Sequence, residues 1–215
     1  MKLVFTGIQG CGKGTQARLL QEKYGFEIVE MGGELRKVIA SGSELGLKLK
    51  KTMDAGYLVG DEDGSAVMKA AIEEYKSHEK VIFDAFIRLD WNKQVFDSYL
   101  SDYTVVFFNL SEEKAKKRLL GRMYNPKTGE TFPSGTETDP KNGDELIQRK
   151  DDNEESILKR IEEYVKNTLP IVEAQKQEGR VIELNADQAI LDVFAELEKK
   201  LGFAEEKDSC LMNNE

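Results

Sequence analysis

The chain has 215 residues, a formal net charge of −9, 40% hydrophobic residues and 33% charged residues, which suffices for one or two domains with a sizeable core. The acidic balance argues against a nucleic-acid partner, because a phosphate backbone requires a basic face. No apolar run reaches membrane-spanning length, and the two cysteines, Cys11 and Cys210, show no disulfide or metal spacing. We therefore expect a cytoplasmic protein that binds neither nucleic acid nor membrane. We also expect it to be a monomer.

Five short apolar runs alternate with helical patterns along the chain, at residues 3–6, 26–29, 81–83, 104–109 and 180–184. Buried runs that alternate with helices are typical of a parallel sheet covered by helices on both faces. Ligands of such sheets bind at the carboxyl ends of the strands. The expected fold is therefore α/β, with a five-stranded parallel sheet.

The segment GIQGCGKGT at residues 7–15 follows the first apolar run and precedes an amphipathic helical pattern. Its glycines allow the backbone to curl with its N–H groups pointing inward, and the next helix directs its positive end to the same place. The side chain of Lys13 is expected to face solvent and to reach phosphate oxygens. This context predicts a phosphate-binding loop. The expected ligand contacts come from Gly10, Cys11, Gly12, Lys13, Gly14 and Thr15.

Two segments interrupt the alternation of strands and helices. Residues 30–59 are polar and helical, and SGSE at 41–44 predicts a helix break followed by a new N-cap. Residues 125–142 contain three prolines and no helical period, which is typical of a functional loop or lid. We expect a single domain with a core, an insert at 30–59, a lid at 122–153 and a polar tail at 204–215. The core comprises residues 1–29, 60–121 and 154–203.

Asp84 directly follows an apolar run. A carboxylate at such a strand end, beside a phosphate-binding loop, can hold Mg²⁺ through water, whereas the structural alternative is an Asp that caps the next helix.

Phosphoryl transfer also needs cations that neutralise the transferring group. The chain offers Arg36, Arg88, Arg118, Arg122, Arg149 and Arg160. The spacing of Arg118 and Arg122 predicts that they share one helix face. On one straight helix Arg149 and Arg160 would lie about 16 Å apart, so a hinge near residues 150–153 is needed to bring them together.

These motifs resemble those of the adenylate kinase family over residues 1 to about 202. The loop shares Gly-Lys-Gly-Thr-Gln with that family, whereas the general P-loop pattern has Ser or Thr directly after Lys. The other matching segments are LR at 35–36, SGSELG at 41–46, MDAGYLV at 53–59, DAFIR at 84–88, RLLGR at 118–122 and RKDDNEE at 149–155.

The resemblance implies a P-loop kinase that transfers the γ-phosphoryl group of ATP reversibly and in line to a nucleoside monophosphate. The insert would close over the monophosphate and the lid over ATP. Mg²⁺ would accompany ATP, organised by Asp84 through water. Lys13 and the loop amides would hold the triphosphate, and Arg118 would pack on the donor base.

The same resemblance assigns the remaining site residues. Arg36 and Arg88 would hold the phosphate of the monophosphate, while Arg122, Arg149 and Arg160 would gather on the transferring group. The implied catalytic set is Lys13, Arg88, Arg122, Arg149 and Arg160. The implied monophosphate site is Met31, Arg36, Val59, Ala85, Arg88, Asn92, Arg149 and Arg160.

The chain departs from the family pattern at several positions. Gln9 and Ile87 replace prolines, Ala85 replaces a glycine, and Met31 stands where Thr is usual. Gly33 replaces an Asp and so removes a carboxylate near the metal.

The lid departs from the family as well. Many relatives bind Zn²⁺ there through cysteine pairs, but Asn125, Thr128, Asp139 and Asn142 occupy the equivalent places. None of these is a thiolate or an imidazole, so we expect a hydrogen-bonded polar cluster and no zinc.

The acceptor is expected to be AMP. A UMP or CMP kinase is the alternative, because Asn92 stands where adenylate kinases usually carry Gln. A third reading is a nucleotide-binding sensor with little activity, which Gly33 and Ile87 favour and which the retained arginines and Lys13 oppose.

Overall fold

The computed structural model describes residues 1–149 and 152–203. At its centre is a five-stranded sheet in the order β2-β3-β1-β4-β8, with every neighbouring pair parallel. Each boundary lies within one residue of the predicted run, which confirms the α/β fold. The strands are β1 (Lys2–Gly7), β2 (Glu27–Glu30), β3 (Val81–Asp84), β4 (Thr104–Asn109) and β8 (Val181–Asn185).

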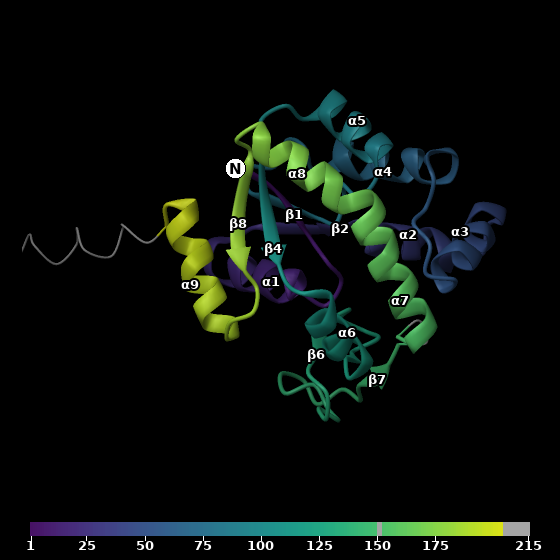
Figure 1. The fold of residues 1–215 in the computed structure, drawn as a ribbon. Helices are drawn as coiled ribbons and strands as arrows, with labels where there is room; N and C mark the ends of the chain where they lie inside the picture. The colour runs from purple at the N-terminus through teal and green to yellow at the C-terminus, as the bar shows by residue number, and fades with distance from the viewer. Residues whose placement is uncertain (150–151, 204–215) are drawn as a thin grey trace, which may run out of the picture.

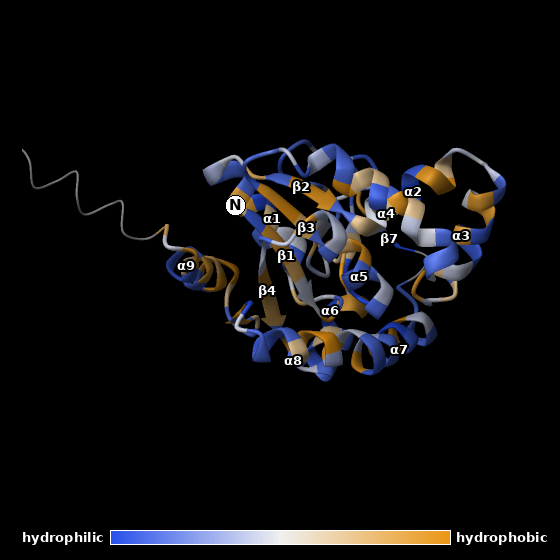
Figure 2. Cartoon of the chain, turned by 90° about the horizontal axis from the view of Figure 1, so that it is seen from above, coloured by the Kyte–Doolittle hydropathy of each residue, from blue (hydrophilic) through white to orange (hydrophobic). Residues whose placement is uncertain are grey.

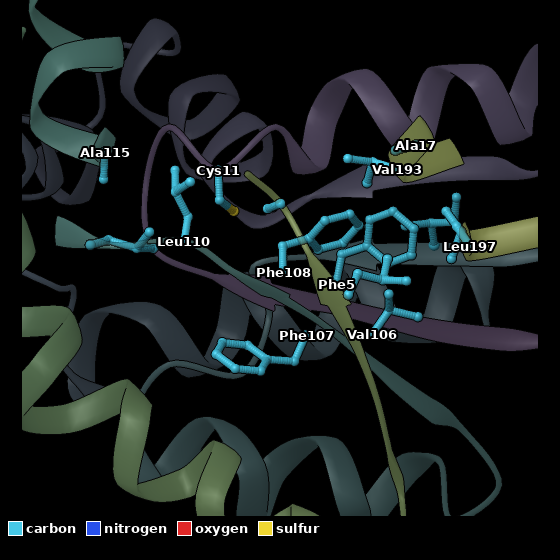
Figure 3. Packing of buried hydrophobic residues seen from close by; sticks show 14 of the residues in the cluster. Phe5, Cys11, Ala17, Val106, Phe107, Phe108, Leu110, Ala115, Val193 and Leu197 are labelled. Carbon is cyan, nitrogen blue, oxygen red and sulfur yellow. The ribbon is translucent and has the colours of Figure 1, made fainter. Parts of the chain in front are cut away.

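Helices cover both faces of this sheet (Figure 1). Successive residues of β1 point into two hydrophobic clusters, Leu3 and Phe5 into one and Val4 into the other. Figure 3 shows Phe5 of β1 packed near Val193 and Leu197. Because both faces are buried, the strands read as continuous apolar runs. The first cluster includes α1 (Lys13–Tyr24) and α9 (Ile190–Leu201), and the second includes α4 (Asp61–Tyr75) and α5 (Asp90–Tyr99).

The glycine-rich loop leaves the carboxyl end of β1, which lies between β3 and β4 in the sheet. Chain connections diverge to either side of β1 at this point, which is where open α/β sheets bind ligands. Gly7 has φ 144°, and a Cβ there would lie 2.6 Å from the carbonyl oxygen of Phe108. Gly12, at φ 97°, is the N-cap of α1. Only glycine suits these two positions.

The insert forms the helices α2 (Met31–Ala40) and α3 (Glu44–Asp54). The predicted N-cap is confirmed, since the Ser43 hydroxyl accepts a hydrogen bond of 3.1 Å from the Gly46 amide. Leu35 and Leu49 are buried in the second cluster, so the insert packs on the core. Figure 2 shows the two helices at the end of the molecule opposite α9.

After α6 (Glu112–Leu120) the chain forms a small antiparallel sheet that the sequence did not predict. Its strands are β5 (Met123–Tyr124), β6 (Thr131–Phe132) and β7 (Ile147–Gln148), in the order β6-β5-β7. Strands of two residues are too short to show a period of two. The predicted lid segment is therefore a loop region anchored by short pairings.

A long helical run returns the chain from this small sheet to the core (Figure 1). It consists of α7 (Glu154–Glu163), a π-helical turn (Tyr164–Thr168) and α8 (Leu169–Gln177). Pro170 lacks an N–H and its ring would clash with the carbonyl four residues earlier, which explains the wider turn there. The Thr168 hydroxyl donates to the Arg88 carbonyl at 3.1 Å, so this helix supports the loop after β3. Within residues 1–149 and 152–203, no helix has the length and apolar character to cross a membrane.

Ala85 follows β3 with φ 59°, a left-handed conformation that the described residues otherwise reserve for glycine. This conformation costs an alanine about 1 kcal/mol relative to glycine. Ala85→Gly is therefore expected to raise the free energy of unfolding by about 1 kcal/mol, measured by urea denaturation. Ala186→Gly, at a buried residue with ordinary φ, should lower it instead. Equal losses in both variants would contradict the strain at Ala85.

Candidate active site

A cleft of about 950 Å³ lies at the carboxyl ends of the strands, lined by the glycine-rich loop, the insert and the small sheet. Every residue that the sequence placed in the site lines it. The glycine-rich loop and the start of α1 contribute Gly10, Cys11, Gly12, Lys13, Gly14 and Thr15, and the end of β3 with the segment after it contributes Asp84, Ala85 and Arg88. The other elements contribute Met31, Arg36, Val59, Asn92, Arg118, Arg122, Arg149 and Arg160.

Lys13 does not face solvent as the sequence suggested. Its side chain is buried, with the residue 8% exposed, and its ammonium group donates to the carbonyls of Gly7 (2.9 Å) and Ile8 (3.2 Å). The sulfur of Cys11 lies 3.3 Å from the same nitrogen. An ammonium group has three donors, and the curled loop surrounds Lys13 with acceptors. Lys13 is therefore held inside the loop, at the wall of the cleft.

Asp84 ends β3, and its Cα is in register with those of Phe5 on β1 and Glu30 on β2. Burial raises the pKa of Asp84 to about 6, opposed by the charge of Lys13 and assisted by that of Glu30. One carboxylate oxygen, Oδ1, is buried and has no hydrogen-bond partner among the described residues. The capping alternative fails, because α5 begins at Asp90 with Leu89 at its N-cap. An unpartnered buried carboxylate oxygen suits a metal-bound water.

Two arginines of the expected set meet at one buried carboxylate, that of Asp152. Arg122 donates to it in a bidentate manner, from Nε at 2.9 Å and from Nη2 at 2.6 Å. Arg160 donates from Nη1 at 3.1 Å. The Asp152 side chain is 0% exposed, and burial lowers the pKa of Arg122 while Asp152 opposes that shift. Asp152 thus holds two cations side by side at the cleft.

The route by which these arginines converge differs from the spacing argument. α6 ends at Leu120, and Gly121 caps it, so Arg122 lies beyond the helix and does not share its face with Arg118. Arg149 directly follows β7, while Arg160 lies on α7. The two arginines are not on one straight helix, so the separation of about 16 Å that such a helix would impose does not apply. The hinge expected at residues 150–153 lies partly outside the described residues.

The other four arginines come from four parts of the chain: α2, the loop after β3, α6 and the end of β7. Arg36 lies 3.7 Å from the carboxylate of Glu30, and burial lowers the pKa of Arg88 while the charge of Asp84 opposes that shift. Arg118 donates to the Ala186 carbonyl at 3.1 Å. The guanidinium of Arg149 lies 5.6 Å from the ring centroid of Tyr124. A cleft lined by this many cations is suited to a polyanionic ligand.

Asn92 has a local bonding role that its position in sequence does not reveal. Its side-chain oxygen accepts from the backbone amides of Arg88 (3.2 Å) and Leu89 (2.8 Å). Its nitrogen lies 3.7 Å from the sulfur of Met68. The amide therefore fixes the turn that carries Arg88, at the wall of the cleft.

The polar cluster of the lid has a different membership from the one expected. Asn125 donates to the carboxylates of Asp139 (2.8 Å) and Asp144 (3.3 Å). The side chains of Thr128 and Asn142 instead accept from amides two residues ahead. Such local bonds are typical of Asn and Thr in turns, and they divert these two side chains from the cluster.

No metal is expected in this lid. The described residues hold no group of three or more His, Cys, Asp or Glu side chains with a metal-binding arrangement. Elemental analysis of the purified protein should find no stoichiometric zinc, and a chelator should leave the melting temperature unchanged in the absence of nucleotide. One zinc per chain, lost when Asp139 is replaced by alanine, would contradict this expectation.

Two carboxylates at the site received no role from the sequence: Glu30 lines the cleft, and Asp152 bonds two arginines that line it. Asp152 is buried between Arg122 and Arg160, and Glu30 lies at the end of β2. For Asp152 the available signal was its place in the RKDDNEE segment, in which nothing distinguishes it from the neighbouring acids. For Glu30 the signal was its place at a predicted strand end.

Comparisons with known proteins agree with this geometry. The family model for adenylate kinase matches residues 5–180. A curated protein named adenylate kinase, from Listeria monocytogenes serotype 4a (strain HCC23), is 32% identical over 212 residues, which cover 94% of this chain and 99% of that protein. The chain belongs to the adenylate kinase family and is a phosphotransferase that acts as a nucleoside monophosphate kinase.

Proposed function

We propose that this protein transfers the γ-phosphoryl group of ATP reversibly to AMP, so that ATP and AMP give two ADP. The observation that supports this proposal most strongly is the meeting of Lys13, Asp84 and the arginine pair at Asp152 in one cleft. The family generally uses ATP with Mg²⁺. Phosphoryl transfer depends mainly on positioning and on charge stabilisation, and this cleft offers both.

On the donor side, the glycine-rich loop and the N-terminus of α1 would bind the triphosphate, as loop amides and helix dipoles favour phosphate. Lys13 would exchange its bonds to the Gly7 and Ile8 carbonyls for phosphate oxygens. Asp84 would hold Mg²⁺ through water with its unpartnered oxygen, and the ion would neutralise charge on the phosphates. Arg118, tied to Ala186, would lie beside the donor base.

At the transferring group, Arg122 and Arg160 would supply positive charge from the positions that Asp152 gives them. Arg149 would join them from the end of β7. The described free cysteine, Cys11, is buried and lies against Lys13, so it is not placed to attack phosphate. We therefore assign direct in-line transfer, without a protein nucleophile.

Described residues of the insert at 30–59 and of the lid, among them Arg36, Val59, Arg122 and Phe132, line the cleft. We assign the insert and the lid to the acceptor and to the donor respectively, each closing over its nucleotide. Closure would exclude water and so prevent hydrolysis of ATP. Arg36 and Arg88 would then bind the acceptor phosphate, with Met31, Val59 and Ala85 at the acceptor.

The acceptor base is the least specified part of this site. AMP is favoured by the family and by the name of the relative. Asn92 favours a pyrimidine as second candidate, since it is shorter than the usual Gln. Its oxygen is already bonded to two backbone amides, so we expect weak discrimination between bases.

An acceptor panel tests this assignment. With ATP and Mg²⁺, kcat/KM for AMP is expected to exceed that for CMP, UMP and GMP, but by only about fivefold, because one base-reading hydrogen bond is worth about 1 kcal/mol. The rate of nucleoside diphosphate formation is measured with each acceptor. A higher kcat/KM for CMP or UMP than for AMP would replace the adenylate assignment with the pyrimidine one.

A further inference from the structure

We propose that Glu30 supplies a second carboxylate to the water shell of the metal that accompanies ATP, beside Asp84. This inference rests on the proposed function and extends it to a residue that the sequence left without a role. Glu30 would act through water, and so it is a positioning residue.

The sheet register places the two carboxylates together. Glu30 and Asp84 are the last residues of β2 and β3, and their Cα atoms are paired in the parallel ladder. Residues in register on neighbouring strands point to the same face of a sheet. Both side chains line the cleft, and the charge of Glu30 is close enough to act on Asp84.

Two neighbouring carboxylates beside phosphate-binding groups repel each other and repel phosphate unless a cation lies between them and the ligand. Lys13, Arg88 and Arg18 are close enough to act on the charge of Asp84, but its buried Oδ1 still has no hydrogen-bond partner among the described residues. A hydrated divalent ion provides both the missing donor and the positive charge. A bound divalent ion therefore accounts for the neighbouring carboxylates of Asp84 and Glu30 better than the protein residues alone do.

Gly33 gives independent support from the neighbouring helix turn. A Cβ built on Gly33 would lie 3.5 Å from the Glu30 Cβ and 3.9 Å from its Oε2. An acidic side chain at position 33 would therefore start in contact with the side chain of Glu30. Glu30 thus supplies a negative charge from the end of β2, whereas Gly33 on α2 supplies none.

The competing explanation is that Glu30 only orients Arg36. The Arg36 guanidinium and the Glu30 carboxylate lie 3.7 Å apart, which is longer than a hydrogen bond. Their side chains are 38% and 34% exposed. An ion pair of this exposure contributes little to positioning. The two explanations differ in what they predict for the metal.

The experiment uses Mn²⁺ as a probe for Mg²⁺ and a non-hydrolysable β,γ-imido analogue of ATP. Calorimetry gives the affinity of the full chain for the analogue with Mn²⁺ and with EDTA. By linkage, the ratio of the two affinities reports how strongly the protein site holds the metal. Glu30→Gln is expected to lower this ratio about tenfold, as the loss of an outer-shell partner commonly does. Glu34→Gln, in the first turn of the adjacent helix α2 but paired with Lys37, should leave the ratio unchanged.

A matched pair of double variants separates charge from folding. Glu30→Gln combined with Gly33→Asp should restore the ratio to within about threefold of the original protein, whereas Glu30→Gln combined with Gly33→Asn should not. An unchanged ratio in Glu30→Gln, or weaker AMP binding with an unchanged ratio, would overturn the proposal. Failure of the original protein to form ADP would instead refute the proposed function, and the binding ratios would still report on Glu30.

Discussion

Lys13→Ala is expected to lower turnover on the order of a hundredfold or more while the chain remains folded. The loss of a cation that stabilises developing charge in a water-excluded site commonly costs about 3 kcal/mol in the transition state. Turnover is measured as ADP formation at saturating nucleotide. The melting temperature is measured in parallel, because Lys13 also donates to the Gly7 and Ile8 carbonyls.

Lys69→Ala serves as the control, since Lys69 is an exposed lysine of α4 outside the cleft. It should keep normal turnover and a normal melting temperature. Near-normal turnover in folded Lys13→Ala would refute the role of the glycine-rich loop in phosphate binding. A large loss in both variants would point to a general effect of charge.

Asp152→Asn is expected to have the largest effect on stability. Asp152 is buried, and it neutralises Arg122 and Arg160 together. Removing one partner of a buried ion pair commonly costs about 3 kcal/mol or more, because the remaining charge stays buried without compensation. The free energy of unfolding is measured by urea denaturation. Turnover should fall as well, because the two guanidinium groups repel each other once the carboxylate is gone.

Glu154→Gln provides the comparison for Asp152→Asn. Glu154 pairs with Lys116 at the surface, where its side chain is 67% exposed, and such pairs contribute at most about 1 kcal/mol. Its effect on both stability and turnover should be small. If Asp152→Asn changed the unfolding free energy no more than Glu154→Gln does, Asp152 would not hold the arginine pair.

The core of the fold was predictable because its signal is local and repeated. Strands buried on both faces, such as β1 with Leu3 and Phe5 on one side and Val4 on the other, leave unbroken apolar runs in the sequence. The Ser43 N-cap was also predictable, since Ser is a preferred N-cap residue directly before a helical pattern. These features depend on neighbours within a few residues.

Features that depend on distant partners escaped prediction. The strands β5, β6 and β7 form only by pairing with one another, and two residues carry no periodic signal. The π-helical turn before Pro170 interrupts a pattern that reads as one continuous helix. In both cases the sequence indicates the segment, but tertiary pairing or a local steric clash decides its conformation.

The site shows the same division. The residues expected in the site all line the cleft, because glycine spacing is a local signal for the loop and the family resemblance indicated the others. It did not show that Lys13 bonds to loop carbonyls, since that depends on how the loop curls. Nor did it distinguish Asp152 from the neighbouring acids, because its role comes from Arg122, which is 30 positions away.

The central claim is that this cleft transfers phosphate directly from ATP to AMP. The most direct measurement is the fate of the label from γ-³²P-ATP incubated with AMP, Mg²⁺ and the protein. The label is expected to appear in the β-phosphate of ADP, and only when AMP is present. No label is expected on the denatured protein. Label released as inorganic phosphate, label bound to the protein, or no transfer at all would contradict this claim.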